Sequence, residues 1–275
     1  MIQLVTDSSA DLPKELIDKY DIHVVPLTIT IDGKEYQEGI DLTPQDFHTM
    51  LNNSKELPKT SQPSPGAFAD LFKTLASKGP ILCLTISSGL SGTYQSACIG
   101  RDMSQVDVTV FDTLAGSLAH GLQLIAARKL ADEGLSIEKI VEYLMEYRKH
   151  SNILILLDTL ENIVKGGRLS KFQGSLAKVL DIKVLLENDE GKVKLTEKVR
   201  GKKKFLKRTI ELIGERKTDF KDTVFGITHI DNLEDAEYLR DEIINKYNPK
   251  DVIINYMGAT MGTYAGKGGM IVSFY

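Results

Sequence analysis

The sequence predicts an α/β fold in two domains: an N-terminal parallel-sheet α/β domain over residues 1–157 and a C-terminal α+β domain with a mixed sheet over residues 158–275. Strand-like apolar runs alternate with helical patterns through the first half, which is typical of a parallel sheet with crossover helices. The second half contains two strand-like runs around the turn Asp189-Glu190-Gly191, the pattern of an antiparallel hairpin. This change of pattern places the domain boundary near Leu157.

Apolar runs and turn residues locate the elements of the first half. Strands are predicted at residues 2–6, 23–31, 81–86, 106–112 and 153–157. Proline in a first helical turn and 3.6-residue periodicity predict helices that start near residues 13 and 44 and helices over residues 67–77, 93–103, 117–133 and 137–149. The Pro-broken segment 59–64 is predicted to be a loop.

The second half is predicted by the same signals. Its hairpin strands are placed at residues 183–188 and 192–198, and later strands at 223–229, 252–257 and 270–274. Helices are predicted over residues 205–217 and 233–247. The glycine-rich segment 258–269 is predicted to be a loop, because glycine is unfavourable inside a helix.

Composition narrows the class of protein. The chain has 275 residues, is 42% hydrophobic and carries a formal net charge of −4, which argues against general nucleic-acid binding. Cys83 and Cys98 fit no metal or redox spacing, and no pair of histidines has metal-ligand spacing. No window of 18 apolar residues and no secretory leader pattern is present, so we expect a cytoplasmic protein without an integral membrane segment.

The richest candidate site is the turn at residues 87–93, Ser-Ser-Gly-Leu-Ser-Gly-Thr, between an apolar strand and a helix. Its glycines allow close backbone approach, while its hydroxyls and the free N–H groups of the helix start can bind phosphate or carboxylate. The alternative is a turn whose hydroxyls only cap the helix. A P-loop would need Lys after Gly92, and neither a dinucleotide fingerprint nor a nucleophile elbow fits the spacing.

A serine hydrolase that used Ser91 would need a base nearby. His120 and His229 follow strand ends, and with Tyr264 they are the candidates for that base. The other three histidines are interpreted as structural or solvated. The sequence thus favours an anion-binding turn over a hydrolytic site.

Two further segments carry polar side chains. The hydroxyl-rich turn Thr60-Ser61-Gln62-Pro63-Ser64 is, taken alone, a rigid loop that caps the next helix. A basic run spans residues 200–208 and includes Arg200 and Lys202. It is either a solvated face or a docking patch for an acidic protein partner.

Taken together, these turns resemble the DegV family. The resemblance rests on stretches that follow in order through the chain: Thr-Asp-Ser-Ser-Ala-Asp-Leu-Pro at residues 6–13, Val-Val-Pro-Leu at 24–27, Thr-Ser-Gln-Pro-Ser at 60–64, Ser-Ser-Gly-Leu-Ser-Gly-Thr-Tyr-Gln-Ser-Ala at 87–97, residues 160–170 ending Lys-Gly-Gly-Arg-Leu-Ser, and Gly262-Thr263. Each stretch alone is moderately specific, and the ordered set is very specific.

The resemblance implies a DegV-like two-domain protein that buries a long-chain fatty acid such as palmitate, stearate or oleate, with the second domain closing the acyl-chain pocket. It places the carboxylate on hydroxyls of Thr60 or Ser61 and of Ser91. The remaining ligand-binding residues that we expect are Gly92, Thr93 and Tyr264. No catalytic residue, metal or other cofactor is expected.

Some members of the family are similar to the binding subunit of bacterial fatty acid kinase. The resemblance therefore implies a lipid-binding protein that presents its fatty acid to a separate kinase catalytic subunit. The resulting acyl-phosphate would enter phospholipid metabolism. We place docking of this partner at Arg168, Arg200 and Lys202. Competing hypotheses are a serine-nucleophile lipid hydrolase or transferase and a lipid-responsive interaction module.

The final glycine-rich loop departs from the family pattern Gly-Thr-His-x-Gly-Pro-Gly. Here Tyr264 stands in place of the histidine and Lys267 in place of the proline. A phenol donates a hydrogen bond but carries no positive charge near neutral pH.

Overall fold

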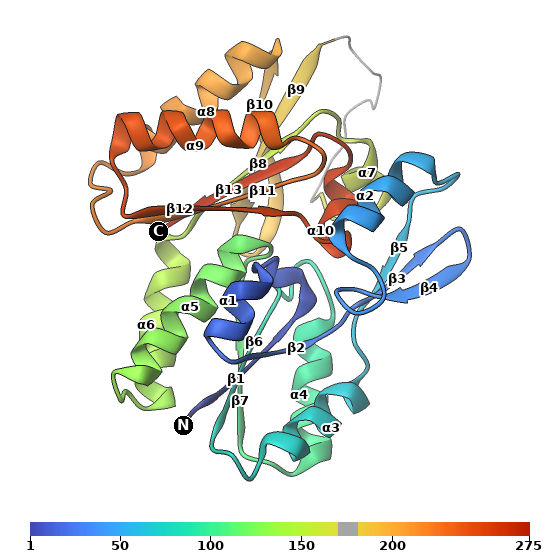
Figure 1. The fold of residues 1–275 in the computed structure, drawn as a ribbon, viewed down its shortest axis with the longest axis vertical. Coiled ribbons are helices and arrows are strands. Elements are labelled where there is room, and N and C mark those ends of the chain that lie inside the picture. Colours follow the sequence, from blue (N-terminus) through green and yellow to red (C-terminus); the bar gives the residue numbers. More distant parts are fainter. Residues whose placement is uncertain (170–180) are drawn as a thin grey trace.

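The computed structural model describes residues 1–169 and 181–275, which form three sheets with helices packed around them (Figure 1). Ser170, the last residue of the Lys-Gly-Gly-Arg-Leu-Ser stretch, lies outside the described residues. The predicted combination of a parallel sheet in the first half and a mixed sheet in the second half is confirmed.

The first sheet is parallel throughout. Its strands lie in the order β2 (Ile22–Val25), β1 (Gln3–Asp7), β6 (Ile81–Thr85) and β7 (Val108–Asp112). One face packs against α3 (Pro65–Leu75) and α4 (Thr93–Ser104). The other face packs against α1 (Lys14–Lys19), α5 (Leu118–Asp132) and α6 (Ile137–His150).

The second sheet is mixed. Its strands lie in the order β10 (Lys192–Arg200), β9 (Ile182–Asp189), β8 (Asn152–Leu157), β13 (Met270–Phe274), β11 (Val224–His229) and β12 (Asp251–Tyr256). β11 and β12 are parallel, and the other neighbouring pairs are antiparallel. Helices α8 (Lys202–Arg216) and α9 (Leu233–Tyr247) cover one face, as Figure 1 shows.

The two sheets divide the chain slightly before the predicted boundary. β8 ends at Leu157, yet it pairs with β9 and β13 of the second sheet. The chain therefore passes from one sheet to the other between α6 and β8. The division into domains at residue 157 stays a prediction.

A third sheet was not predicted. It is antiparallel in the order β4 (Lys34–Gln37), β3 (Thr28–Ile31) and β5 (Lys59–Ser61), and α2 (Pro44–Asn53) lies beside it. The single strand predicted over residues 23–31 is wrong, because Pro26 lacks an N–H group and divides it into β2 and β3. The predicted loop at 59–64 is wrong at its start, where pairing with β3 makes β5 a strand.

The predicted loop at residues 258–269 is also wrong, because it contains α10 (Ala259–Ala265). Two buried carboxylates stabilise the start of this helix. Asp11 accepts the N–H of Gly258 at 2.9 Å and Glu38 accepts the N–H of Thr260 at 2.7 Å. These contacts satisfy N–H groups that a helix start leaves without partners, and local propensity could not predict them.

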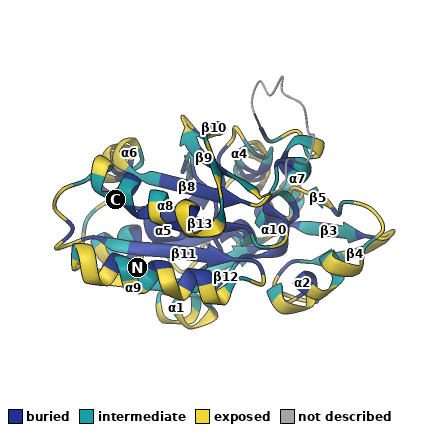
Figure 2. Ribbon diagram, turned by 90° about the horizontal axis from the view of Figure 1, so that it is seen from above, coloured by how far each residue is buried: buried dark blue, intermediate teal, exposed yellow. Residues whose placement is uncertain are grey.

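The central strands β1, β6, β8, β11 and β13 are buried, whereas the outer faces of α1, α2, α6 and α9 are exposed (Figure 2). A short helix, α7 (Glu161–Lys165), follows β8 and lies close to α10. Among the described residues, no helix has both the length and the apolar character that a membrane span requires.

Candidate functional site

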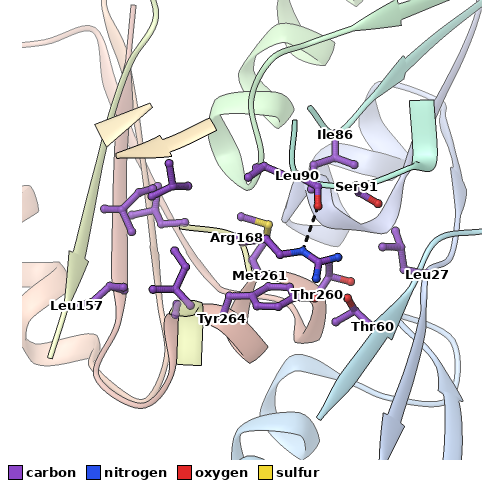
Figure 3. A pocket seen from close by; sticks show the side chains of 15 residues that line it. Leu27, Thr60, Ile86, Leu90, Ser91, Leu157, Arg168, Thr260, Met261 and Tyr264 are labelled. Carbon is purple, nitrogen blue, oxygen red and sulfur yellow. Dashed lines mark hydrogen bonds between the residues drawn. The ribbon is translucent and has the colours of Figure 1, made fainter. Parts of the chain in front are cut away.

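A cavity lies where parts of all three sheets meet (Figure 3). Its empty volume is about 560 Å³, part of it open to solvent. Its apolar lining consists of Leu27, Ile86, Leu90, Ile155, Leu157, Ile163, Val193, Met261, Ala265 and Ile271. Its polar lining consists of Thr60, Ser91, Arg168, Thr260 and Tyr264.

The polar side chains gather on one side of the cavity, away from Leu157 (Figure 3). The hydroxyl oxygens of Thr60 and Tyr264 lie 2.6 Å apart, which joins β5 to α10. Ser91 and Thr93 form a second hydroxyl pair at 2.9 Å. This side of the cavity therefore offers hydroxyl groups that can donate hydrogen bonds to an anion.

Arg168 supplies a positive charge at the same place. It is the one charged residue among the described residues that line the cavity. Its guanidinium lies over the Tyr264 ring, 4.9 Å from the centroid, and donates to the carbonyls of Leu90 at 3.2 Å and Gly166 at 2.7 Å. A guanidinium held in this way can form a charge-assisted hydrogen bond with a carboxylate.

The structure places the other predicted ligand-binding residues outside this lining. Ser61 is exposed on β5, one position along the strand from Thr60 and therefore on the opposite face. Gly92 precedes α4, and Thr93 is fully buried beneath Ser91.

The predicted docking residues are separated in the structure. Arg168 lies in the cavity lining instead of on an outer surface. Arg200 is exposed at the end of β10. Lys202 begins α8 and pairs with Asp235 at 2.8 Å. Arg200 and Lys202 are absent from the described cavity lining.

The turn at residues 87–93 contributes less to the cavity than its four hydroxyls suggested. Ser87 is fully buried, and its hydroxyl donates to the carbonyl of Gly191 at 2.6 Å. Its own carbonyl accepts the N–H groups of Leu90 at 3.0 Å and Ser91 at 3.1 Å. The hydrogen bond of Ser87 thus attaches the turn to the β9–β10 hairpin. Of the four residues of the turn that carry hydroxyls, Ser91 lines the cavity.

Some lining residues were missed by the sequence analysis, chiefly Thr260 and Met261 on α10 and Val193 on β10. The spacing of positions 260 and 264 is a signal for Thr260, but it applies only if residues 258–269 contain a helix. The two positions are four apart, so a helix places both side chains on one face. Val193 had no comparable signal, because the docking of the hairpin onto the Ser87 turn determines its position.

None of the five histidines, all of which are described, lies in the cavity lining. His120 is buried, contacts Thr6 Oγ1 at 2.9 Å and the Leu84 carbonyl at 3.2 Å, and burial lowers its pKa. The Nδ1 atom of His229 accepts the N–H of Asn232 at 3.3 Å, and burial also lowers the pKa of His229. Ser91 therefore has no histidine base, and the described residues include no cluster suited to a metal ion.

The chain is similar to known proteins over its whole length. A family model described as "Uncharacterised protein, DegV family" matches residues 1–275. A DegV domain-containing protein of Caldanaerobacter subterraneus subsp. tengcongensis is 35% identical over 267 residues, covering 96% of this chain and 95% of the relative.

Solved structures are similar over nearly the full length. A fatty-acid-binding DegV family protein from Thermus thermophilus matches with a TM-score of 0.94 at 30% identity, covering 100% of this chain and 99% of that chain. DegV from Bacillus subtilis, a fatty acid binding protein, matches with a TM-score of 0.90 at 31% identity, covering 99% and 98% of the two chains. The chain belongs to the DegV family.

Proposed function

We propose that this protein binds a long-chain fatty acid in the cavity, with the carboxylate beside Thr60, Ser91 and Arg168. The observation that carries the proposal is the asymmetry of the lining, which is apolar apart from one side that bears hydroxyls and a guanidinium. The relatives from Thermus and Bacillus bind fatty acids, which supports the same ligand class here.

The expected energetics support this ligand. Each buried CH₂ group contributes about 0.8 kcal/mol, so a chain of ~16 carbons gives a gross gain near 12 kcal/mol before the costs of binding. A carboxylate removed from water needs hydrogen-bond donors and preferably a counter-charge. Thr60, Ser91 and Arg168 supply hydroxyl donors and a positive charge in one place.

Native mass spectrometry of purified and then delipidated protein tests this function. We expect co-purified fatty acid, and after extraction we expect renewed binding of palmitate, stearate or oleate. Methyl palmitate is the matched ligand, because it keeps the acyl chain and removes the negative charge. If delipidated, folded protein binds none of the free acids, the proposed function is wrong.

We further propose that the protein is a non-catalytic subunit that presents the fatty acid to a separate kinase subunit for acyl-phosphate formation. The absence of a histidine near Ser91 supports a binding role over hydrolysis. The kinase partner is proposed because the chain resembles subunits that present fatty acids to a kinase. Incubation with a bacterial fatty acid kinase catalytic subunit, ATP and palmitate should yield palmitoyl phosphate. If no palmitoyl phosphate forms although the binding protein is saturated with palmitate, this role is contradicted.

Docking of the kinase is assigned to Arg200, which is exposed, in preference to Lys202, which is paired with Asp235. Arg200→Ala should reduce recovery of the kinase subunit in a pull-down and leave palmitate affinity unchanged. Lys202→Ala is the matched control at the same end of α8. Equal recovery by wild type and Arg200→Ala would remove Arg200 from the interface.

A further inference from the structure

A buried carboxylate behind α10 links two walls of the cavity without lining the cavity itself. Glu38 follows β4 and is 6% exposed. Its Oε1 atom accepts the Thr260 N–H at 2.7 Å, and its Oε2 atom accepts the hydroxyls of Thr260 and of Ser8, the latter at 2.6 Å. Thr260 is a residue of the cavity lining.

Ser8 extends the contact to a second lining residue. While its hydroxyl donates to Glu38, its oxygen accepts the N–H of Leu27 at 3.0 Å. Leu27 lines the cavity and leads into β3, which pairs with β5 and thus with the strand that carries Thr60. Glu38 therefore connects the start of α10 to the segment that positions Thr60.

Few other side chains could accept the hydrogen bonds that the Glu38 carboxylate accepts. Three donors converge on Glu38, and two carboxylate oxygens have enough lone pairs to accept them all. Burial raises the pKa of Glu38, while the hydrogen bonds from Ser8 and Thr260 act in the opposite direction. Glycine at position 258 leaves room for this carboxylate, because a Cβ atom there would lie 2.6 Å from Oε1 of Glu38.

We propose that Glu38 is a positioning residue for fatty-acid binding, which holds Leu27 and the first turn of α10 at the spacing that the carboxylate site requires. Tyr264 lies one helical turn beyond Thr260, and Thr60 lies on the strand system that follows Leu27. A change in the contacts of Glu38 shifts these two groups relative to each other. This inference rests on the proposed fatty-acid function.

Three variants separate positioning from general destabilisation. Glu38→Gln replaces one acceptor oxygen with a donor, so three donors can no longer all be accepted. Ser8→Ala removes the link to Leu27 and leaves the carboxylate in place. Ser9→Ala is the matched control, since the adjacent buried Ser9 hydroxyl donates to Asp7 instead of Glu38.

The binding experiment is a titration of each delipidated variant with saturated fatty acids of increasing chain length. Glu38→Gln and Ser8→Ala should bind every fatty acid about tenfold more weakly than wild type, which corresponds to about 1.4 kcal/mol. The gain in affinity per added CH₂ should be unchanged, because the apolar wall is intact. Ser9→Ala should bind like wild type. Wild-type affinity in folded Glu38→Gln and Ser8→Ala would overturn the inference.

Hydrogen exchange of the ligand-free proteins keeps this test independent of the proposed function. The amides of Leu27 and Thr260 should exchange faster in Glu38→Gln than in wild type or Ser9→Ala. If wild type binds no fatty acid, the proposed function fails, but faster exchange still supports the link through Glu38. Unchanged exchange at both amides would overturn the link, even if fatty acids bind.

Discussion

Thr60 and Tyr264 are 204 positions apart in the sequence, yet their hydroxyl oxygens lie 2.6 Å apart at the polar side of the cavity. The contact joins the small antiparallel sheet to the helix in the glycine-rich segment. It occurs where the family pattern has a histidine and this chain has a tyrosine. A phenol thus forms the contact across this side of the cavity.

Removing the phenol hydroxyl with Tyr264→Phe should lower the free energy of unfolding by about 1 kcal/mol, the usual net contribution of one hydrogen bond. Thr60→Val removes the same bond from the other side. The double variant should therefore lose less than the sum of the two single losses. Urea unfolding of the four proteins measures the coupling. Strict additivity would show that the two hydroxyls act independently.

Arg168 is predicted to contribute affinity through its charge. Arg168→Gln should weaken palmitate binding at least tenfold, about 1.4 kcal/mol or more, because a charged hydrogen-bond partner of the carboxylate is lost. Binding of methyl palmitate should change much less. Arg200→Gln is the control, since it removes an equal charge from an exposed position. Equal losses for acid and ester would assign Arg168 a packing function only.

Much of the fold follows from local patterns in the sequence. Apolar runs predict β1 and β6, and Pro44 predicts the start of α2. The errors arise where distant contacts determine local structure. Residues 59–61 become a strand by pairing with β3, and α10 forms where Glu38 and Asp11 accept its first N–H groups.

The candidate site was predictable to a similar degree. Thr60, Ser91 and Tyr264, expected from the resemblance, come together in the cavity lining. The charge of Arg168 was expected at a partner surface, because nothing in the segment 166–168 indicates that its side chain stacks on Tyr264. The turn at residues 87–93 was expected to hold the anion, but the structural contact of Ser87 with Gly191 could not be predicted, because it depends on how the hairpin docks.

Ser87 is predicted to stabilise the junction between the two main sheets. Ser87→Ala leaves the carbonyl of Gly191 without this donor, so the free energy of unfolding should fall by about 1–3 kcal/mol. The adjacent Ser88 is exposed, and Ser88→Ala should be close to neutral. Thermal unfolding compares the pair. Equal stability of both variants would contradict a structural role for the Ser87 hydroxyl.

Acidification is predicted to weaken the contribution of His120 to stability. Burial lowers the pKa of His120, and Asp7 and Asp112 oppose this shift only in part. Between the folded pKa and the unfolded value of about 6.5, the unfolded chain binds more protons, so stability falls as pH falls. The contribution is fully present above the unfolded pKa and is lost as pH decreases through the folded pKa.

The difference in melting temperature between wild type and His120→Gln isolates this effect, because the variant cannot titrate at that position. This difference in melting temperature should become smaller as the pH is lowered from about 7.5 to about 5. The raised pKa values of Asp11 and Glu38 have the opposite sign: their contribution is present at low pH and is lost as pH rises. They are common to both proteins and cancel in the difference. A constant difference across this range would contradict the prediction.

The position of the Tyr264 ring is predicted to depend on Gly166. A Cβ atom at Gly166 would lie 2.3 Å from Cε1 of Tyr264, whereas the backbone φ of −76° suits any residue. Gly166→Ala should therefore displace the ring, break its contacts with Thr60 and Arg168, and weaken palmitate binding.

The next residue, Gly167, gives a control in which the backbone is strained but the Tyr264 ring is not displaced. Gly167 has a φ of +72° and open space around its Cα, so Gly167→Ala strains the backbone without touching the ring. It should lower stability by about 1 kcal/mol and leave palmitate affinity largely intact. Equal effects of the two variants on affinity would show that the loop backbone, and not the contact with Tyr264, determines binding.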